Sequence, residues 1–342
     1  ILAPSWSPNS QYVAFFIEQE KQANLYIFDV NKQTLKQVEH LALNSVITAR
    51  PYRWLSDSSA IIANKAVNIN QSAPTESAAS AVPVISQTTG EKAPVRTYQN
   101  LLATPHDKAL FKHYGLGQLV KITVDGKSHN LGEPGLIKGF RTSPDAKHIL
   151  VAKIQEPFSY LVPYSRFAST WQVIDDKGNV IKEIAKQPLA ENIPQGFDSV
   201  RTGKRSISWR GDKAATLVWT EAQDGGSMKT EVEHHDHVYT WQAPFKNKPK
   251  LFAKVERRYA GIEWANDNVA LIADWRFSDR MLRSFIIDPN NADKTRKLFN
   301  ERSYNDAYKD PGNFVYAQTK FGNYTVKVND NHEMMLTGTG AS

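Results

Sequence analysis

Short segments in which apolar and polar residues alternate lie between polar turns along the chain. This is the pattern of antiparallel β-strands. Ser5–Phe16 predicts a turn followed by an alternating strand, and Asn24–Val30 and Gln33–Val38 predict two further strands. The turn-and-strand unit then recurs at Arg53–Ala63, Thr142–Lys153, Ser208–Trp219 and Ile262–Ala273. Tetrapeptides such as Ser-Pro-Asp-Ala fit type I turns, because proline suits the second turn position. The chain is therefore expected to be built from repeated sheets.

Each later copy of the unit is followed by another strand and a polar turn. These strands are predicted at Gln118–Val124, Trp171–Ile174, Val238–Trp241 and Phe285–Ile287. Four short strands repeated about every 50 to 90 residues favour a β-propeller over a β-sandwich, whose strands lack a repeated opening motif. We expect an all-β propeller with four-stranded blades. About five or six blades are present, the sixth near Asn313–Lys320, in an incomplete ring of roughly seven.

An insertion over 65–116 interrupts the second predicted blade. Its first part, Lys65–Gly90, is rich in Ser, Ala, Thr, Gln and Pro and is expected to be a flexible loop. Its second part, 97–114, is expected to be a short helical excursion. Thr104 can cap the helix, and Pro105 and Asp107 suit its first turn.

The predicted helix has an apolar face. Leu110, Phe111 and Tyr114 fall on one side at helical spacing, so that side is expected to face the sheets.

Two proline-containing stretches, Pro157–Phe167 and Gln187–Trp209, lie between clear strands. Because proline cannot donate to a central ladder, they are predicted to leave the sheet as long loops. Such loops often carry binding groups. The alternative is that their aromatic residues only cover the end of a sheet.

These two stretches also carry a family resemblance. Together with DKAATLVWTEAQDGG (Asp212–Gly226), YAGIEW (Tyr259–Trp264) and KAPVRTYQNLLATPHDKALFKHY (Lys92–Tyr114), they resemble the propeller of the glutamyl endopeptidase branch of the prolyl oligopeptidase serine peptidases. The similarity runs from about Trp6 to the C-terminus. It implies the non-catalytic part of a peptidase that cleaves peptides after glutamate. The catalytic α/β-hydrolase domain would lie elsewhere on the same polypeptide, and bacterial relatives imply periplasmic or secreted residence.

The chain itself contains no nucleophile elbow. A serine hydrolase of this family needs G-x-S-x-G between a strand and a helix. The nearest segment, Gly225–Lys229, lacks the final glycine, so Ser227 is interpreted as a turn residue. This chain alone is therefore not expected to catalyse hydrolysis.

The segment EVEHHDH, Glu231–His237, is the candidate for metal binding. On a strand, Glu233, His235 and His237 would share one face, which is a plausible donor set for Zn²⁺ or Ni²⁺. Exposed strands also carry such polar alternation, and the resembling family has other residues here. The metal site is accordingly the weaker interpretation.

Arginine is the residue suited to reading a glutamate carboxylate, which it can bind with two hydrogen bonds. Arg166, Arg201 and Arg205 lie in the predicted loops, and Tyr160 and Tyr164 could line the same surface. Ordinary salt bridges or exposed loop charges are the alternative for each arginine.

Composition narrows the remaining functions. The 342 residues are 41% hydrophobic and 23% charged, include no cysteine, and carry a net charge of +7. The basic residues are scattered, so nucleic acid is not an expected partner. No apolar run reaches the roughly 18 residues of a membrane helix. No phosphate-binding or dinucleotide motif predicts a cofactor, and Asp175–Asn179 fits a hairpin turn better than a calcium loop.

Two other functions fit a propeller. A stand-alone, TolB-like periplasmic propeller would bind partner proteins without chemistry. A sugar-binding propeller would need exposed tryptophans at equivalent loop positions. The sequence does not separate the first of these from a peptidase fragment, except by the resemblance.

Overall fold

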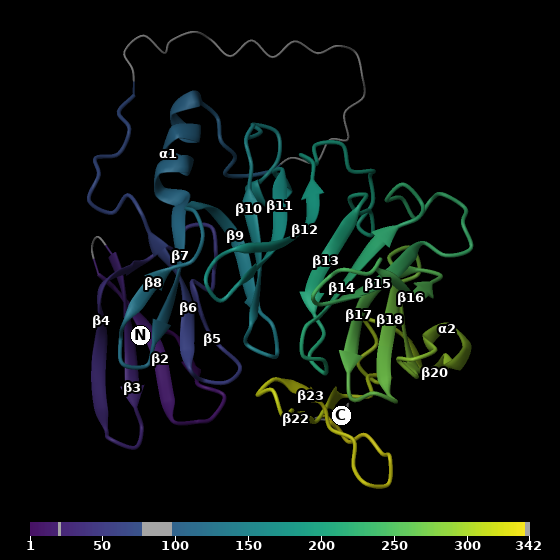
Figure 1. Ribbon diagram of the computed structural model, residues 1–342. Helices are drawn as coiled ribbons and strands as arrows, with labels where there is room; N and C mark the ends of the chain where they lie inside the picture. The colour runs from purple at the N-terminus through teal and green to yellow at the C-terminus, as the bar shows by residue number, and fades with distance from the viewer. Residues whose placement is uncertain (20–21, 77–97, 339–342) are drawn as a thin grey trace, which may run out of the picture. The chain divides into compact units, whose positions relative to one another are not determined.

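The computed structural model describes residues 1–19, 22–76 and 98–338. The chain divides into two compact units, Ile1–Asn192 and Ile193–Ser342. We call each four-stranded antiparallel sheet a blade and number the blades I to V along the chain. Unit 1 contains blades I to III, and unit 2 contains blades IV and V (Figure 1).

The strands of unit 1 follow one another in sequence order within each blade. Blade I consists of β1 (Leu2–Trp6), β2 (Tyr12–Gln19), β3 (Gln22–Asp29) and β4 (Thr34–Leu43). Blade II consists of β5 (Tyr52–Trp54), β6 (Ala60–Ala66), β7 (Leu116–Thr123) and β8 (Ser128–Asn130). Blade III consists of β9 (Gly135–Thr142), β10 (His148–Ile154), β11 (Ser169–Asp175) and β12 (Val180–Gln187). Brief pairings of β4 with β6 and of β7 with β9 join the three blades.

Unit 2 repeats the same arrangement. Blade IV consists of β13 (Lys204–Trp209), β14 (Thr216–Ala222), β15 (Asp236–Gln242) and β16 (Lys250–Val255). Blade V consists of β17 (Arg258–Trp264), β18 (Ala270–Arg276), β19 (Met281–Ile287) and β20 (Lys297–Ser303), with α2 (Ala292–Thr295) before its last strand. The sixth predicted blade is different. In the described residues it comprises two short pairs, β21 (Asn313–Phe314) with β24 (Leu336–Thr337), and β22 (Tyr316–Gln318) with β23 (Tyr324–Val326).

Packing between neighbouring blades explains the apolar middle strands. In β6, Ile61 and Ala63 belong to the core shared with blade I, whereas Ala60 and Ile62 belong to the core shared with blade III. Because successive side chains of a strand point to opposite faces, a strand between two cores must be apolar at every position. A third core joins blades IV and V within unit 2.

The predicted turns lie between the first and second strands of blades I to III. In blade III, the Ala146 N–H donates to the Ser143 carbonyl at 3.0 Å, and the Ser143 hydroxyl accepts from the His148 N–H at 3.0 Å. Equivalent backbone bonds link Ser10 to Ser7 and Ser58 to Leu55. The serine therefore closes the turn from which the second strand starts.

The helix of the insertion is α1 (Pro105–Gly115), and residues 98–104 before it are not helical. Thr104 and Asp107 form a reciprocal capping box, with Pro105 in the first turn. The expected loop over 65–90 is described only in part. Residues 65–66 belong to β6, and 77–90 lie outside the described residues.

In blades II, III and IV the longest connection within the blade lies at the end where the second strand finishes and the third begins. We call this the long-loop end. The connections 67–115, 155–168 and 223–235 lie there, and 188–203 joins the fourth strand of blade III to the first strand of blade IV. Blade V differs, because its longest connection, 288–296 with α2, follows its third strand. In unit 1, α1 stands at this end of blade II (Figure 1). No helix of the described segments is long and apolar enough to span a membrane.

Candidate functional site at the long-loop ends

In unit 1 the long-loop end is built around three phenylalanines. Phe111 of α1 contacts Phe158 and Phe167 of the 155–168 loop, with ring centroids 5.2 and 5.9 Å away, and the two loop rings stack at 5.5 Å. Phe158 and Phe167 are buried. The predicted apolar face of the helix is thus confirmed for Phe111, but Tyr114 is 53% exposed. The loop and the helix form one packed layer.

Three predicted site residues lie in this layer. The Lys108 ammonium lies 3.8 Å from the centre of the Tyr160 ring, and the Arg166 guanidinium lies 5.2 Å from that of Tyr98. The Tyr164 hydroxyl donates to the Ile47 carbonyl at 3.4 Å, and the ring is 42% exposed. The structure therefore brings Tyr160, Tyr164 and Arg166 together on a partly exposed surface with two cations. A cation over an aromatic face is favourable.

Hydrogen bonds from three sides fix the same loop. Lys138 donates to the Ser165 carbonyl at 2.7 Å, the Ala190 N–H donates to the Arg166 carbonyl at 3.0 Å, and Lys112 pairs with Glu156 at 2.8 Å. Proline keeps this segment out of the ladder, and these bonds replace the ladder as its support.

In unit 2 the long-loop end contains a buried ion network centred on Arg258. Its guanidinium donates to Asp224 at 2.5 Å and to Asp236 at 2.9 Å, and both carboxylates are fully buried. Arg205 also pairs with Asp236, and His235 Nδ1 lies 2.7 Å from Asp224 Oδ2. Burying charges is costly unless they are paired and hydrogen-bonded, as Arg258, Asp224 and Asp236 are.

The network fixes two connections of unit 2. Arg258 Nε donates to the Asp198 carbonyl at 3.0 Å, and the Asp198 carboxylate accepts from the Phe277 N–H at 2.9 Å. Asp236 accepts from the Tyr259 N–H at 2.7 Å. The 188–203 loop and the start of blade V are therefore held through the same charges.

Electrostatic interactions favour the ionised form of Asp224. Burial by itself raises the pKa of Asp224, but the hydrogen bonds from Arg258 and His235 outweigh it and hold that pKa below its usual value. A second pair is similar: the Arg283 guanidinium lowers the pKa of Glu256, although its partial burial opposes this.

The other two predicted arginines have different settings. Arg205 is 11% exposed and its charge faces Asp236, which supports the salt-bridge alternative for this residue. Arg201 lies before β13 in the 188–203 loop and is partly exposed. Arg258, Asp224 and Asp236 were not predicted from the sequence, because a buried ion network is formed by residues distant in sequence.

The predicted histidine strand is wrong for residues 231–235. β15 begins at Asp236, and the preceding residues fold as a loop around Asp224. His235 faces Asp224, while His237 lies within β15, and Glu233 is 89% exposed. Among the described residues, no group of three or more His, Asp or Glu side chains is placed to hold a metal ion.

Ser227 lies in a turn, as predicted. Its N–H donates to the Asp224 carbonyl at 3.3 Å, and its hydroxyl accepts from the Lys229 N–H at 3.3 Å. The hydroxyl therefore closes a local turn.

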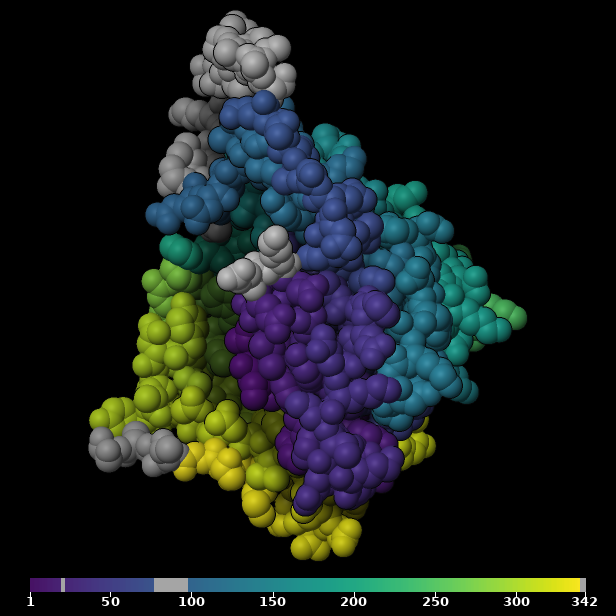
Figure 2. All heavy atoms as spheres, turned by 90° about the vertical axis from the view of Figure 1, so that its left-hand side faces the viewer, coloured from purple at the N-terminus to yellow at the C-terminus, as the bar shows by residue number. Residues whose placement is uncertain are grey.

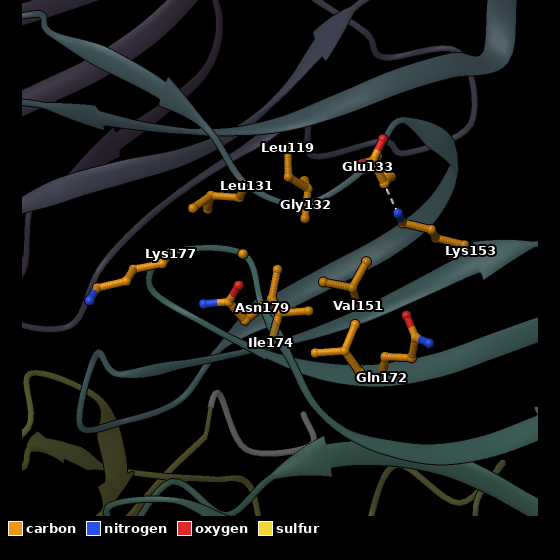
Figure 3. A pocket seen from close by; sticks show the side chains of 12 residues that line it. Leu119, Leu131, Gly132, Glu133, Val151, Lys153, Gln172, Ile174, Lys177 and Asn179 are labelled. Atoms are coloured by element: carbon orange, nitrogen blue, oxygen red, sulfur yellow. Dashed lines mark hydrogen bonds between the residues drawn. The ribbon is translucent and has the colours of Figure 1, made fainter.

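A cavity of about 470 Å³ lies between blades II and III of unit 1. Figure 3 shows Val151 and Ile174 within it, and Lys153 joined to Glu133 on one side; the Lys153 ammonium donates to the Glu133 carbonyl at 2.6 Å. Burial lowers the pKa of Lys153. The lining combines aliphatic side chains with this partly buried cation.

A second hollow, of about 560 Å³, lies at the long-loop end of unit 1. Val46, Ile69 and Tyr114 line it together with the amides of Asn44 and Asn68. Figure 2 shows the part of the molecule concerned, with blade I in purple and the α1 region in blue above it. Both amides bond to backbone carbonyls at the end of α1, so they support the fold.

Comparison with known proteins decides the family. A rice protein named "probable glutamyl endopeptidase, chloroplastic" is 32% identical over 99% of this chain, and its Arabidopsis thaliana counterpart is 31% identical over 99%. The chain belongs to the glutamyl endopeptidase branch of the prolyl oligopeptidase serine peptidases. It spans 37% and 36% of the length of these two relatives. No family model matches the chain.

The fold is supported by a solved structure. A Bacteroides ovatus protein described as a "putative dipeptidyl aminopeptidase IV" superimposes with a TM-score of 0.52 at 10% identity, over 86% of this chain and 40% of that protein. The predicted all-β propeller with four-stranded blades is confirmed. The number of blades in a complete ring stays a prediction. The plant relatives are named as chloroplast proteins, and periplasmic or secreted residence also stays a prediction.

Proposed function

We propose that this chain is the non-catalytic, substrate-gating propeller of a serine endopeptidase that cleaves peptides after glutamate. The observation that carries the proposal is the alignment of 99% of the chain with little more than a third of a glutamyl endopeptidase. The remainder of such a protein has room for an α/β-hydrolase domain. The lack of G-x-S-x-G in the sequence agrees with a division of labour between this chain and that domain.

Gating follows from the physics of the fold. Blades arranged around a channel admit extended peptides and exclude folded domains by size. The long connections at one end of the blades provide a surface for binding groups on a rigid support. Tyr160, Tyr164 and Arg166 remain our proposed substrate-facing residues of unit 1, and Arg201 that of unit 2.

The complete natural protein that contains this chain tests the proposal. A short peptide with one glutamate should be cleaved after that residue, and its glutamine counterpart should be cleaved far more slowly. A serine-directed inhibitor should abolish both activities. The same glutamate placed within a stably folded domain should resist cleavage until the domain is unfolded.

Three results would count against the proposal. Cleavage of the folded domain as fast as the peptide would contradict the proposed gating. Equal rates for the glutamate and glutamine peptides would contradict the proposed specificity. Inhibitor-sensitive turnover by residues 1–342 alone would show that this chain is catalytic.

A further inference from the structure

Three arginines lie near the first strands of blades II and III in unit 1. Arg53 is the central residue of β5, Arg50 precedes that strand, and Arg141 lies in β9. Arg53 Nε donates to the Phe140 carbonyl at 3.0 Å, which places its guanidinium beside the backbone that continues into Arg141. The hydrogen bond therefore joins the two strands at the cationic residues.

The charge of Arg53 has no carboxylate partner among the ion pairs of the described residues. Its pKa is lowered, first by partial burial and then by the positive charges of Arg141 and Arg50. A guanidinium nevertheless stays protonated at neutral pH. Arg205, Arg258 and Arg283 of unit 2 differ, because each faces a buried aspartate. Like charges held close together oppose folding unless an anion joins them.

There is room for such an anion on the neighbouring strand. A Cβ placed on Gly139 would meet no heavy atom within 4 Å. Gly139 and Arg141 are two residues apart in β9 and so share a face. Among the described strands β5 is paired with β6 alone, so no strand covers its other edge. The arginines are thus next to open space rather than packed core.

We propose that Arg50 and Arg53 form a carboxylate-binding site that takes an acidic side chain of the peptide substrate. Arginine presents paired N–H donors that match a carboxylate, and partial burial strengthens such a bond. The proposal rests on the peptidase function proposed above. It adds a recognition element within the propeller, separate from the aromatic layer around α1.

The test compares the complete enzyme with its Arg53→Gln variant. The substrates are a peptide with glutamate only at the cleaved bond, one with a further glutamate several residues away, and its glutamine counterpart. Losing a hydrogen bond to a charged group is expected to reduce kcat/KM about 10-fold for the acidic peptide that uses the site, mainly through KM. The peptide that responds identifies which glutamate is bound. Arg53→Lys should restore part of the loss.

Lys248→Gln is the matched control, because it removes one positive charge from an exposed turn of blade IV. It should leave all rates unchanged, and thermal unfolding should show that Arg53→Gln folds. No loss for any of the three peptides, or a loss that Arg53→Lys does not reduce, would overturn the site.

Binding separates this inference from the proposed activity. A fluorescent glutamate-containing peptide and its glutamine counterpart are titrated into the complete protein whether or not cleavage occurs. Preferential binding that Arg53→Gln abolishes supports the site even without hydrolysis. Equal binding of the two peptides to the wild-type protein overturns it, even if cleavage after glutamate is found.

Discussion

Arg258 joins parts of unit 2 that are far apart in the sequence. With 1% of its side chain exposed, it contacts Asp224, Asp236 and the Asp198 carbonyl, which come from three separate parts of the chain. A long planar cation with five donors suits this position, because its guanidinium makes four hydrogen bonds to these three residues. The network therefore joins side chains from distant parts of the chain to one another and to backbone groups.

Arg258→Leu should lower the free energy of unfolding by about 3–5 kcal/mol, because it leaves two buried carboxylates without their main partner. Arg276→Gln is the control, since Arg276 is 43% exposed and pairs with Asp279 only three residues away. Exposed pairs contribute about 0–1 kcal/mol. Denaturant unfolding of the two variants measures both changes, and similar losses would contradict the central role of Arg258.

The lowered pKa of Asp224 predicts a pH dependence of stability. An aspartate in an unfolded chain has a pKa of about 3.9. Because the folded pKa is lower, the unfolded state binds more protons below this pH, so stability is complete above about pH 4 and falls as the pH drops through the folded pKa. Asp224→Asn should be less stable at pH 7 and lose less stability between pH 5 and pH 3.

Asp330→Asn is the control for this titration, because Asp330 is exposed in a turn of the same unit. Its unfolding free energy, measured at pH 7, 5 and 3, should follow that of the wild-type protein. If Asp224→Asn follows the wild-type profile as well, the ion network does not control acid unfolding.

At the scale of elements, glycines set how closely neighbouring blades approach. The turn between β11 and β12 places Gly178 against the backbone of Leu131 and Gly132, which lead into blade III. Gly178 has a φ of +90°, and an added Cβ would lie 2.1 Å from the Gly132 nitrogen. Only glycine allows both the backbone conformation and this contact.

Gly178→Ala should therefore destabilise the protein by about 1–3 kcal/mol more than Gly126→Ala, which is the cost of overpacking. Gly126 occupies the corresponding turn of blade II with a φ of +87°, but its added Cβ would meet only the flexible end of Lys36. Unfolding free energies measured side by side give the difference. Equal unfolding free energies for the two variants would show that the Gly178 turn accommodates the added methyl group without destabilising the protein.

Sequence patterns predicted some elements better than others. The second strands β6, β10, β14 and β18 were predicted because each contains an unbroken run of buried apolar residues. The outer strand β12 was missed, because its first four residues are exposed and show no alternation. The helix was predicted from Thr104, Pro105 and Asp107, since capping depends on local residues alone.

At the scale of the whole molecule, the long connections of blades II, III and IV each follow the second strand of the blade. Strand order alone produces this, because antiparallel strands alternate direction and each insertion stays at the end where it occurs. The relatives are almost three times as long as the chain. The proposed gating, specificity and partnership with a hydrolase domain therefore concern the complete protein.

The sequence by itself determined the repeated strands, the turns that start them, the capped helix and the family. These features depend on residues close together in the chain, or on long sequence segments that resemble those of relatives. Tertiary structure decided which charges meet. Asp224, Asp236 and Arg258 are paired, and Arg53 comes close to Arg141, only because separate strands pack side by side. The burial of these side chains and the distances between them decide what the charges do, and neither can be read from the local pattern of residues.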